Sequence, residues 1–197
     1  MKYHFAFDLD GTVTKHEVLP LIAKELGIEE EMAVLTRRTM DGEIPFDHSF
    51  TMRVDMLKTI PISRVQKIVE KVPLSRTITS FIKEHAERCH IVTGNLDVWI
   101  ELLAQKIGCH IVSSNAHYEG DTLLGIKKIL RKKDIHNQLE APIIAVGDGN
   151  NDVEMLMHAP ISIAYGGVHP PAPTLLEVSH YAIYDEETLC NMLKRLS

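Results

Sequence analysis

The chain begins with a short apolar run that ends in two acidic residues, and this pairing constrains the fold more than any other feature of the sequence. Residues 2–7 are aromatic-rich and almost continuously apolar, and Asp8, Leu9 and Asp10 follow them. Such a run is typical of a parallel strand that is buried on both faces. Ligands of open α/β sheets bind outside the carboxyl ends of the strands. We therefore expect Asp8 and Asp10 to lie at a ligand site, with both side chains on the same side.

These acids also allow a second interpretation, because Asp10 and Gly11 between apolar residues signal a two-residue β-hairpin. A later stretch of the sequence favours the parallel sheet over the hairpin. Residues 143–146 form a second apolar run of strand length, and Asp148 and Asp152 follow it. If the two strands lie in one sheet, four carboxylates meet at one point.

A third motif, residues 92–95, lies between the two acidic ones and reads Val92, Thr93, Gly94, Asn95. Together the three motifs resemble those of the haloacid dehalogenase superfamily of phosphohydrolases, in the order and at the separations typical of that family. The resemblance implies an α/β fold with a Rossmann-like parallel sheet as the core and an inserted helical bundle as a cap.

Hydrophobic periodicity predicts a compatible organisation. Helical spacing and capping residues predict four successive helices, at about residues 17–26, 29–41, 45–57 and 63–72. From residue 77 onward helices and strands alternate, as parallel crossovers require. We therefore expect residues 15–73 to form the cap, and residues 1–14 with 74–197 to form the core.

The stretch from residue 109 to residue 133 is the least regular. It predicts a strand at 109–112, a loop or short hairpin with a turn at Gly120 and Asp121, and a helix opened by the basic run 127–133.

Phosphoryl transfer explains the need for paired acids. Asp8 is our candidate nucleophile, which would form an aspartyl-phosphate. Asp10 is suited to act as general acid and then as general base. Phosphate and nucleophile repel each other, so we expect Mg²⁺, held by Asp8, Asp148 and the main-chain carbonyl of Asp10. Asp152 is expected to support the metal indirectly.

The transferred phosphate also needs hydrogen-bond donors. Thr93 offers a hydroxyl, and Gly94 and Asn95 offer main-chain N–H groups at the start of a predicted helix. A purely structural N-cap is the alternative for Thr93 or Asn95, and the resemblance favours the phosphate. The resemblance further implies a lysine clamp at a helix start before Asp148, for which we expect Lys127 or Lys128.

Within the superfamily, nearly the whole chain resembles the phosphoserine phosphatases. The resemblance implies that Glu17 binds the substrate ammonium group and that Arg53 binds its carboxylate. It further implies substrate-binding roles for three more residues, which are Met40, Phe46 and Asn151.

Some positions depart from the pattern of those enzymes. Gly11 replaces a common serine, Asn95 a glycine and Asn150 an alanine, and the loop 166–171 differs. The substrate could therefore be another small phosphorylated metabolite such as phosphohomoserine, or the enzyme could be a phosphotransferase. A carbon–halogen hydrolase would need neither Asp10 nor Asp148, and a non-catalytic regulatory protein would be expected to lose one of the acids.

Composition and charge argue against several other classes of protein. The net charge of −6 and the pI near 6.0 argue against a nucleic-acid partner. No stretch is long and apolar enough to suggest a membrane span or a targeting segment. We expect a cytoplasmic monomer or homodimer that binds a small phosphorylated metabolite. Three dispersed cysteines indicate neither a disulfide framework nor a zinc site.

Overall fold

A computed structural model describes residues 2–40 and 43–197. Within them, seven strands form one sheet in the order β4-β3-β2-β1-β5-β6-β7. All neighbours are parallel except β3 and β4. The strands are β1 (His4–Phe7), β2 (Cys89–Leu96), β3 (His110–Glu119), β4 (Thr122–Lys128), β5 (Ile143–Gly147), β6 (Ile161–Tyr165) and β7 (Tyr181–Ile183). The predicted α/β class with a largely parallel sheet is confirmed.

Strand β1 lies at the centre of the sheet, which explains its apolar sequence. Phe5, Ala6 and Phe7 are completely buried, because helices cover both faces. Phe7 pairs with Ile91 of β2 and with Val146 of β5. β1 and β5 therefore end at nearly the same level, and the acids that follow them meet there, whereas β2 continues beyond that level to Leu96. The hairpin interpretation is wrong, since both strands that pair with β1 in the described part of the chain, β2 and β5, are parallel to it.

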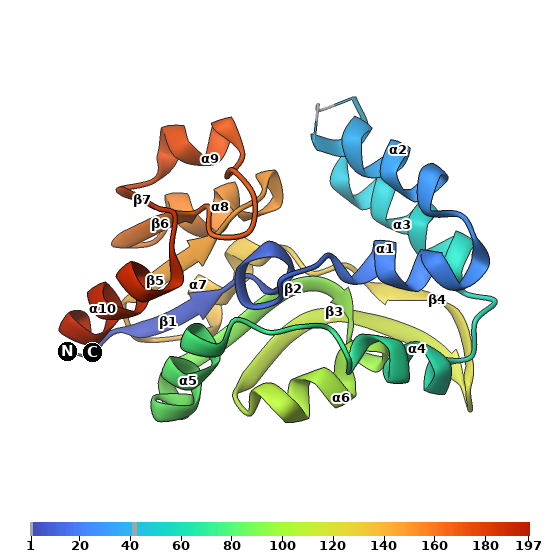
Figure 1. The fold of residues 1–197 in the computed structure, drawn as a ribbon, viewed down its shortest axis with the longest axis horizontal. Helices are drawn as coiled ribbons and strands as arrows, with labels where there is room; N and C mark the ends of the chain where they lie inside the picture. The colour runs from blue at the N-terminus through green and yellow to red at the C-terminus, as the bar shows by residue number, and fades with distance from the viewer. Residues whose placement is uncertain (1, 41–42) are drawn as a thin grey trace.

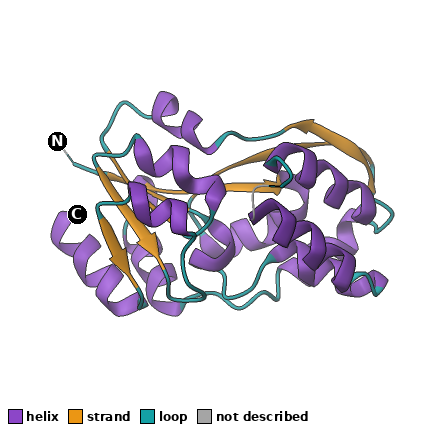
Figure 2. Ribbon diagram, turned by 90° about the horizontal axis from the view of Figure 1, so that it is seen from above, coloured by secondary structure: helices purple, strands orange, loops and turns teal. Residues whose placement is uncertain are grey.

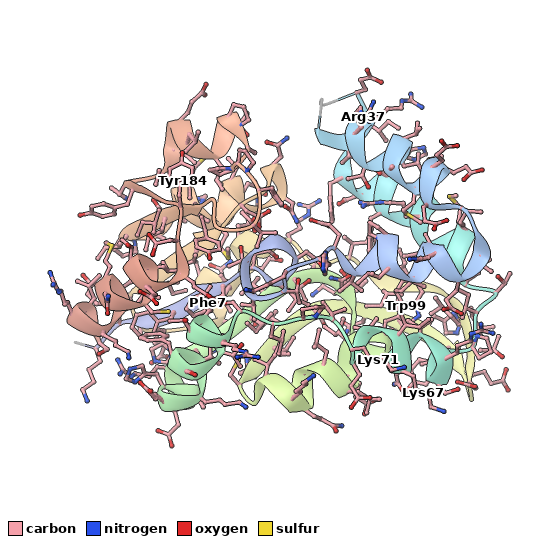
Figure 3. The ribbon with its side chains drawn as sticks, viewed as in Figure 1. Phe7, Arg37, Lys67, Lys71, Trp99 and Tyr184 are labelled. Atoms are coloured by element: carbon pink, nitrogen blue, oxygen red, sulfur yellow. The ribbon has the colours of Figure 1, made fainter. Side chains whose placement is uncertain are left out.

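Two groups of helices form the outer layers (Figure 1). On one face, α5 (Arg76–Glu84), α6 (Asp97–Ile107) and α10 (Glu186–Leu196) share the larger hydrophobic core with the sheet. Phe7 and Trp99, labelled in Figure 3, belong to this core. On the other face lie the shorter helices α7 (Ile135–Gln138), α8 (Val153–Met157) and α9 (Pro173–Val178). No helix in the described ranges could cross a membrane.

The remaining helices lie between β1 and α5 in the chain. They are α1 (Val18–Ala23), α2 (Glu29–Met40), α3 (Phe46–Leu57) and α4 (Ile62–Val69), and they match the four predicted helices closely. Figure 2 shows them gathered at one end of the molecule, beside the long hairpin. The chain leaves and rejoins the sheet region at one place, because Thr14 and Leu74 form a β-bridge and Lys15 N donates to Pro73 O at 2.8 Å.

The irregular stretch differs from its prediction. β3 and β4 form a long antiparallel hairpin that turns at Gly120 and Asp121, where the turn was expected. The helix predicted at 127–133 is absent, because Lys128 ends β4 and only one 3₁₀ turn, Lys132–Asp134, precedes α7. Pairing with β3, which decides this conformation, is not visible in local sequence.

Candidate active site

The acids after β1 sit in a tight loop. Asp8 N donates to Val146 O at 2.9 Å, which continues the pairing with β5 beyond the strand end. Gly11 then takes a φ of +73°, and a Cβ at this position would lie 2.6 Å from Asp148 Oδ2. Glycine is thus required for the loop to pass so close to β5. The turn directs Asp10 toward α1, where its Oδ1 accepts a bond from Val18 N at 2.8 Å.

The structure brings together the carboxylates of both acidic motifs. Asp8, Asp148 and Asp152 are buried, and each offers an oxygen within 4.8 Å of the others. Asp152 Oδ2 accepts bonds from the main-chain N–H groups of Asp148 and Gly149, at 3.2 and 3.0 Å. Thr12 Oγ1 donates to Asp148 Oδ1 at 3.0 Å. The cluster is therefore preorganised by hydrogen bonds from its own loops.

The lysine at this cluster is Lys132, so the expectation of Lys127 or Lys128 is wrong. Lys132 Nζ lies 2.5 Å from Asp8 Oδ1 and 2.6 Å from Asp152 Oδ1. Lys127 and Lys128 instead lie exposed on β4. Nothing in the local sequence distinguishes Lys132 from the other lysines of the basic run 127–133.

Burial and mutual repulsion govern the charges here. Burial raises the pKa of Asp8 well above its ordinary value, Asp152 adds to the rise, and Lys132 opposes it. Burial likewise raises the pKa values of Asp10 and Asp152. Burial alone would lower the pKa of Lys132, but Asp152 and Asp8 outweigh it and raise this pKa. The site therefore holds more carboxylates than its lysine can neutralise, which favours a bound cation.

The third motif lies beside Asp10. Thr93, Gly94 and Asn95 are buried residues of β2, and α6 begins only at Asp97. The prediction that a helix starts at Gly94 and Asn95 is therefore wrong, because both residues still belong to β2. Asn95 Nδ2 donates to Asp10 Oδ2 at 2.5 Å and to Thr93 Oγ1 at 3.1 Å. This link between Asn95 and the second acid was not foreseen.

A cavity of about 720 Å³ opens onto these groups. Of the predicted residues, those that line it are Asp8, Asp10, Glu17, Phe46, Arg53, Thr93, Gly94, Asn95, Asp148 and Asn151. Phe46 lies against Gly94, since a Cβ there would be 2.8 Å from the Phe46 ring. The side chain of Met40 lies outside the described part of the structure, as do the next two residues of its motif.

Two charged side chains from the inserted helices face the cavity. Arg53 is 7% exposed, and within the described residues no carboxylate lies within 4.0 Å of it. Its Nε donates to Ser49 O at 3.4 Å, and burial lowers its pKa. Burial, followed by the charges of Asp10 and Asp148, raises the pKa of Glu17 to about 8. A guanidinium and the carboxyl group of Glu17 therefore both face the cavity.

His169, which no prediction included, also lines the cavity. Its Nε2 lies 3.0 Å from Asp148 Oδ2, and this hydrogen bond raises the pKa of His169 to about 9, against the effect of burial. The only sequence signal was the unusual loop 166–171.

The fold and the acid cluster together define an α/β enzyme that hydrolyses phosphomonoesters. The chain belongs to the haloacid dehalogenase-like hydrolase family, whose sequence model matches residues 5–157.

Named relatives agree with this assignment. The chain is 29% identical over 178 residues to the phosphoserine phosphatase of Methanocaldococcus jannaschii. The aligned residues cover 81% of this chain and 83% of that enzyme. It is 30% identical to that of Streptococcus thermophilus, with 80% and 81% covered. A substrate-bound phosphoserine phosphatase complex superposes with a TM-score of 0.83 at 25% identity, covering 100% and 99% of the two chains. Some other matched phosphoserine phosphatases are longer, and the chain spans about half of their length.

Proposed function

We propose that this protein is a Mg²⁺-dependent phosphatase that hydrolyses O-phosphoserine to serine and phosphate through an aspartyl-phosphate. The observation that carries the proposal is the set of charges in one cavity, where Asp8 and Asp148 of the acid cluster lie with Arg53 and Glu17. A phosphorylated amino acid carries a phosphate, a planar carboxylate and an ammonium group. Arginine binds carboxylates in bidentate fashion, and a glutamate complements an ammonium group.

The acid cluster suits a magnesium ion. Its carboxylate oxygens lie close enough to share one ion, and Mg²⁺ prefers hard oxygen ligands. We propose that Asp8, Asp148 and the main-chain carbonyl of Asp10 hold the ion, and that Asp152 supports the site through Lys132 and the loop after β5. When bound, the ion offsets the repulsion between the phosphate and the carboxylates.

Each side chain of the site has its own role in the proposed reaction. Asp8 attacks phosphorus and becomes phosphorylated as the serine oxygen leaves. Asp10 donates a proton to that oxygen, and then accepts one from the water that hydrolyses the aspartyl-phosphate. The bond from Asn95 orients Asp10 for both steps. Lys132 and Thr93 stabilise the phosphate oxygens, on which negative charge is concentrated.

The inserted helices are proposed to determine specificity. Residues 15–73 contain Glu17, Phe46 and Arg53, which line the same cavity as Asp8 and Asp148 of the acid cluster. We propose that this segment acts as a cap over the core formed by residues 1–14 and 74–197. Its polar groups would bind the serine part, while the core carries out the chemistry.

Arg53→Ala tests the substrate. It should lower kcat/KM for O-phosphoserine by on the order of 10²-fold, since removing a charged hydrogen bond from a closed site costs about 3 kcal/mol. Hydrolysis of p-nitrophenyl phosphate, which has neither carboxylate nor ammonium, should hardly change. Arg64→Ala is the matched control, because Arg64 belongs to the same segment but is exposed and pairs with Glu25. Equal losses on both substrates, or a wild type that does not prefer O-phosphoserine, would reject the substrate assignment.

A further inference from the structure

Two hydrogen bonds from Asn95 end on the same oxygen atom. Its main-chain N–H donates to Thr93 Oγ1 at 3.2 Å, and its side-chain Nδ2 donates to that oxygen at 3.1 Å. Nδ2 also donates to Asp10 Oδ2 at 2.5 Å. In the part of the chain that the structure describes, neither the Thr93 nor the Asn95 side chain bonds to an N–H group of α6. Capping of that helix therefore does not explain these two residues.

The bonds from Asn95 leave the hydroxyl group of Thr93 with one free function. A hydroxyl group has one O–H to donate and two lone pairs with which to accept. Asn95 occupies both lone pairs, and among the described residues the O–H of Thr93 meets no acceptor. Thr93 is 1% exposed and lines the cavity. Its O–H is therefore left to donate to a ligand.

This arrangement depends on a side chain that the phosphoserine phosphatase pattern lacks. A glycine occupies position 95 in that pattern, and glycine has no amide group to offer to Thr93. In this chain the amide is buried and lines the cavity. Because the same amide bonds to Asp10, it also fixes Thr93 and Asp10 relative to each other.

We propose that Asn95 is a positioning residue for phosphate binding, which directs the hydroxyl group of Thr93 to donate to a phosphate oxygen. The inference rests on the function proposed above, in which Thr93 stabilises the phosphate oxygens. Those oxygens accept hydrogen bonds, so a hydroxyl group that can only donate complements them. A donor that is already oriented loses less freedom when phosphate binds than one that rotates about its C–O bond.

The test is a double-mutant cycle in which calorimetry measures the binding of inorganic phosphate to the Mg²⁺-loaded enzyme. Asn95→Ala removes the amide and should weaken phosphate binding about fivefold, as expected for the loss of one neutral hydrogen bond. Thr93→Val removes the hydroxyl group, and in this background Asn95→Ala should have almost no further effect. In the Thr93→Ser background, which keeps the hydroxyl group, the loss should return. Asn115→Ala is the matched control, because Asn115 is exposed on β3 and does not line the cavity.

Two results would overturn the inference. One is phosphate binding that Asn95→Ala leaves unchanged. The other is an equal loss in the Thr93→Val background, which would mean that Asn95 acts through Asp10 or through packing. Asn95→Gly is a second variant in case Asn95→Ala does not fold, because glycine is the residue of the related pattern, and it should give the same result.

Phosphate binding can be measured whether or not O-phosphoserine is hydrolysed. Failure of that substrate would therefore reject the proposed function and leave the cycle decisive. A wild-type enzyme that binds no phosphate would overturn both proposals.

Discussion

Replacing Lys132 with methionine should cost both stability and activity. Its ammonium group is buried and lies 2.5 Å from Asp8 and 2.6 Å from Asp152. Methionine has a similar volume but no charge, so the change leaves two buried carboxylates without their cation. Breaking a buried ion pair from one side typically costs about 3–5 kcal/mol. For a chain of this length, about 3 kcal/mol corresponds to a fall in Tm of ~10 °C.

The assay is thermal and urea unfolding in a metal chelator and again in excess Mg²⁺. The loss of stability should be largest in the chelator and partly recovered in Mg²⁺, because the metal supplies positive charge to the same carboxylates. Phosphatase activity should fall by at least ~10²-fold on O-phosphoserine and on p-nitrophenyl phosphate alike. Lys133→Met is the matched control, since Lys133 pairs with Glu154 at the surface. Full stability in the chelator together with near-normal activity would refute the reasoning, and so would a larger activity loss in Lys128→Met.

Three further predictions concern the metal, the nucleophile and the pH dependence of stability. A chelator should abolish phosphatase activity and Mg²⁺ should restore it, and Asp8→Asn should form no base-labile phosphoenzyme; a phosphoenzyme in that variant would remove Asp8 as nucleophile. His90 is buried between His4 and His110, and burial lowers its pKa from 6.5 to about 4. Its contribution to stability should be fully present above pH 6.5 and fall by up to ~3 kcal/mol as the pH drops toward 4, because only the unfolded chain gains the proton. Urea unfolding across this range should show a shallower pH slope in His90→Gln than in the wild type or in His117→Gln, whose side chain is exposed, and equal slopes would contradict the account.

Local sequence was sufficient for the elements that depend on short-range patterns. The buried strands β1 and β5 were predicted because runs of apolar residues of this length have few other stable environments. The four inserted helices were predicted from their 3.6-residue periodicity. Asp8, Asp10 and Asp148 could be assigned to one site because the carboxyl ends of neighbouring parallel strands lie at one edge of the sheet.

The tertiary structure alone decided which residues complete that site. Lys132, rather than Lys127 or Lys128, reaches the carboxylates because β4 continues the sheet where a helix was expected. The proximity of Gly11 and His169 depends on a contact between segments far apart in the chain. Periodicity and propensity describe how a segment packs against a generic core, whereas these contacts depend on where separate loops end in space. The sequence by itself therefore determined the central strands, the inserted helices and the acids of the site. The packing of distant loops determined that Lys132 and His169 lie beside those acids.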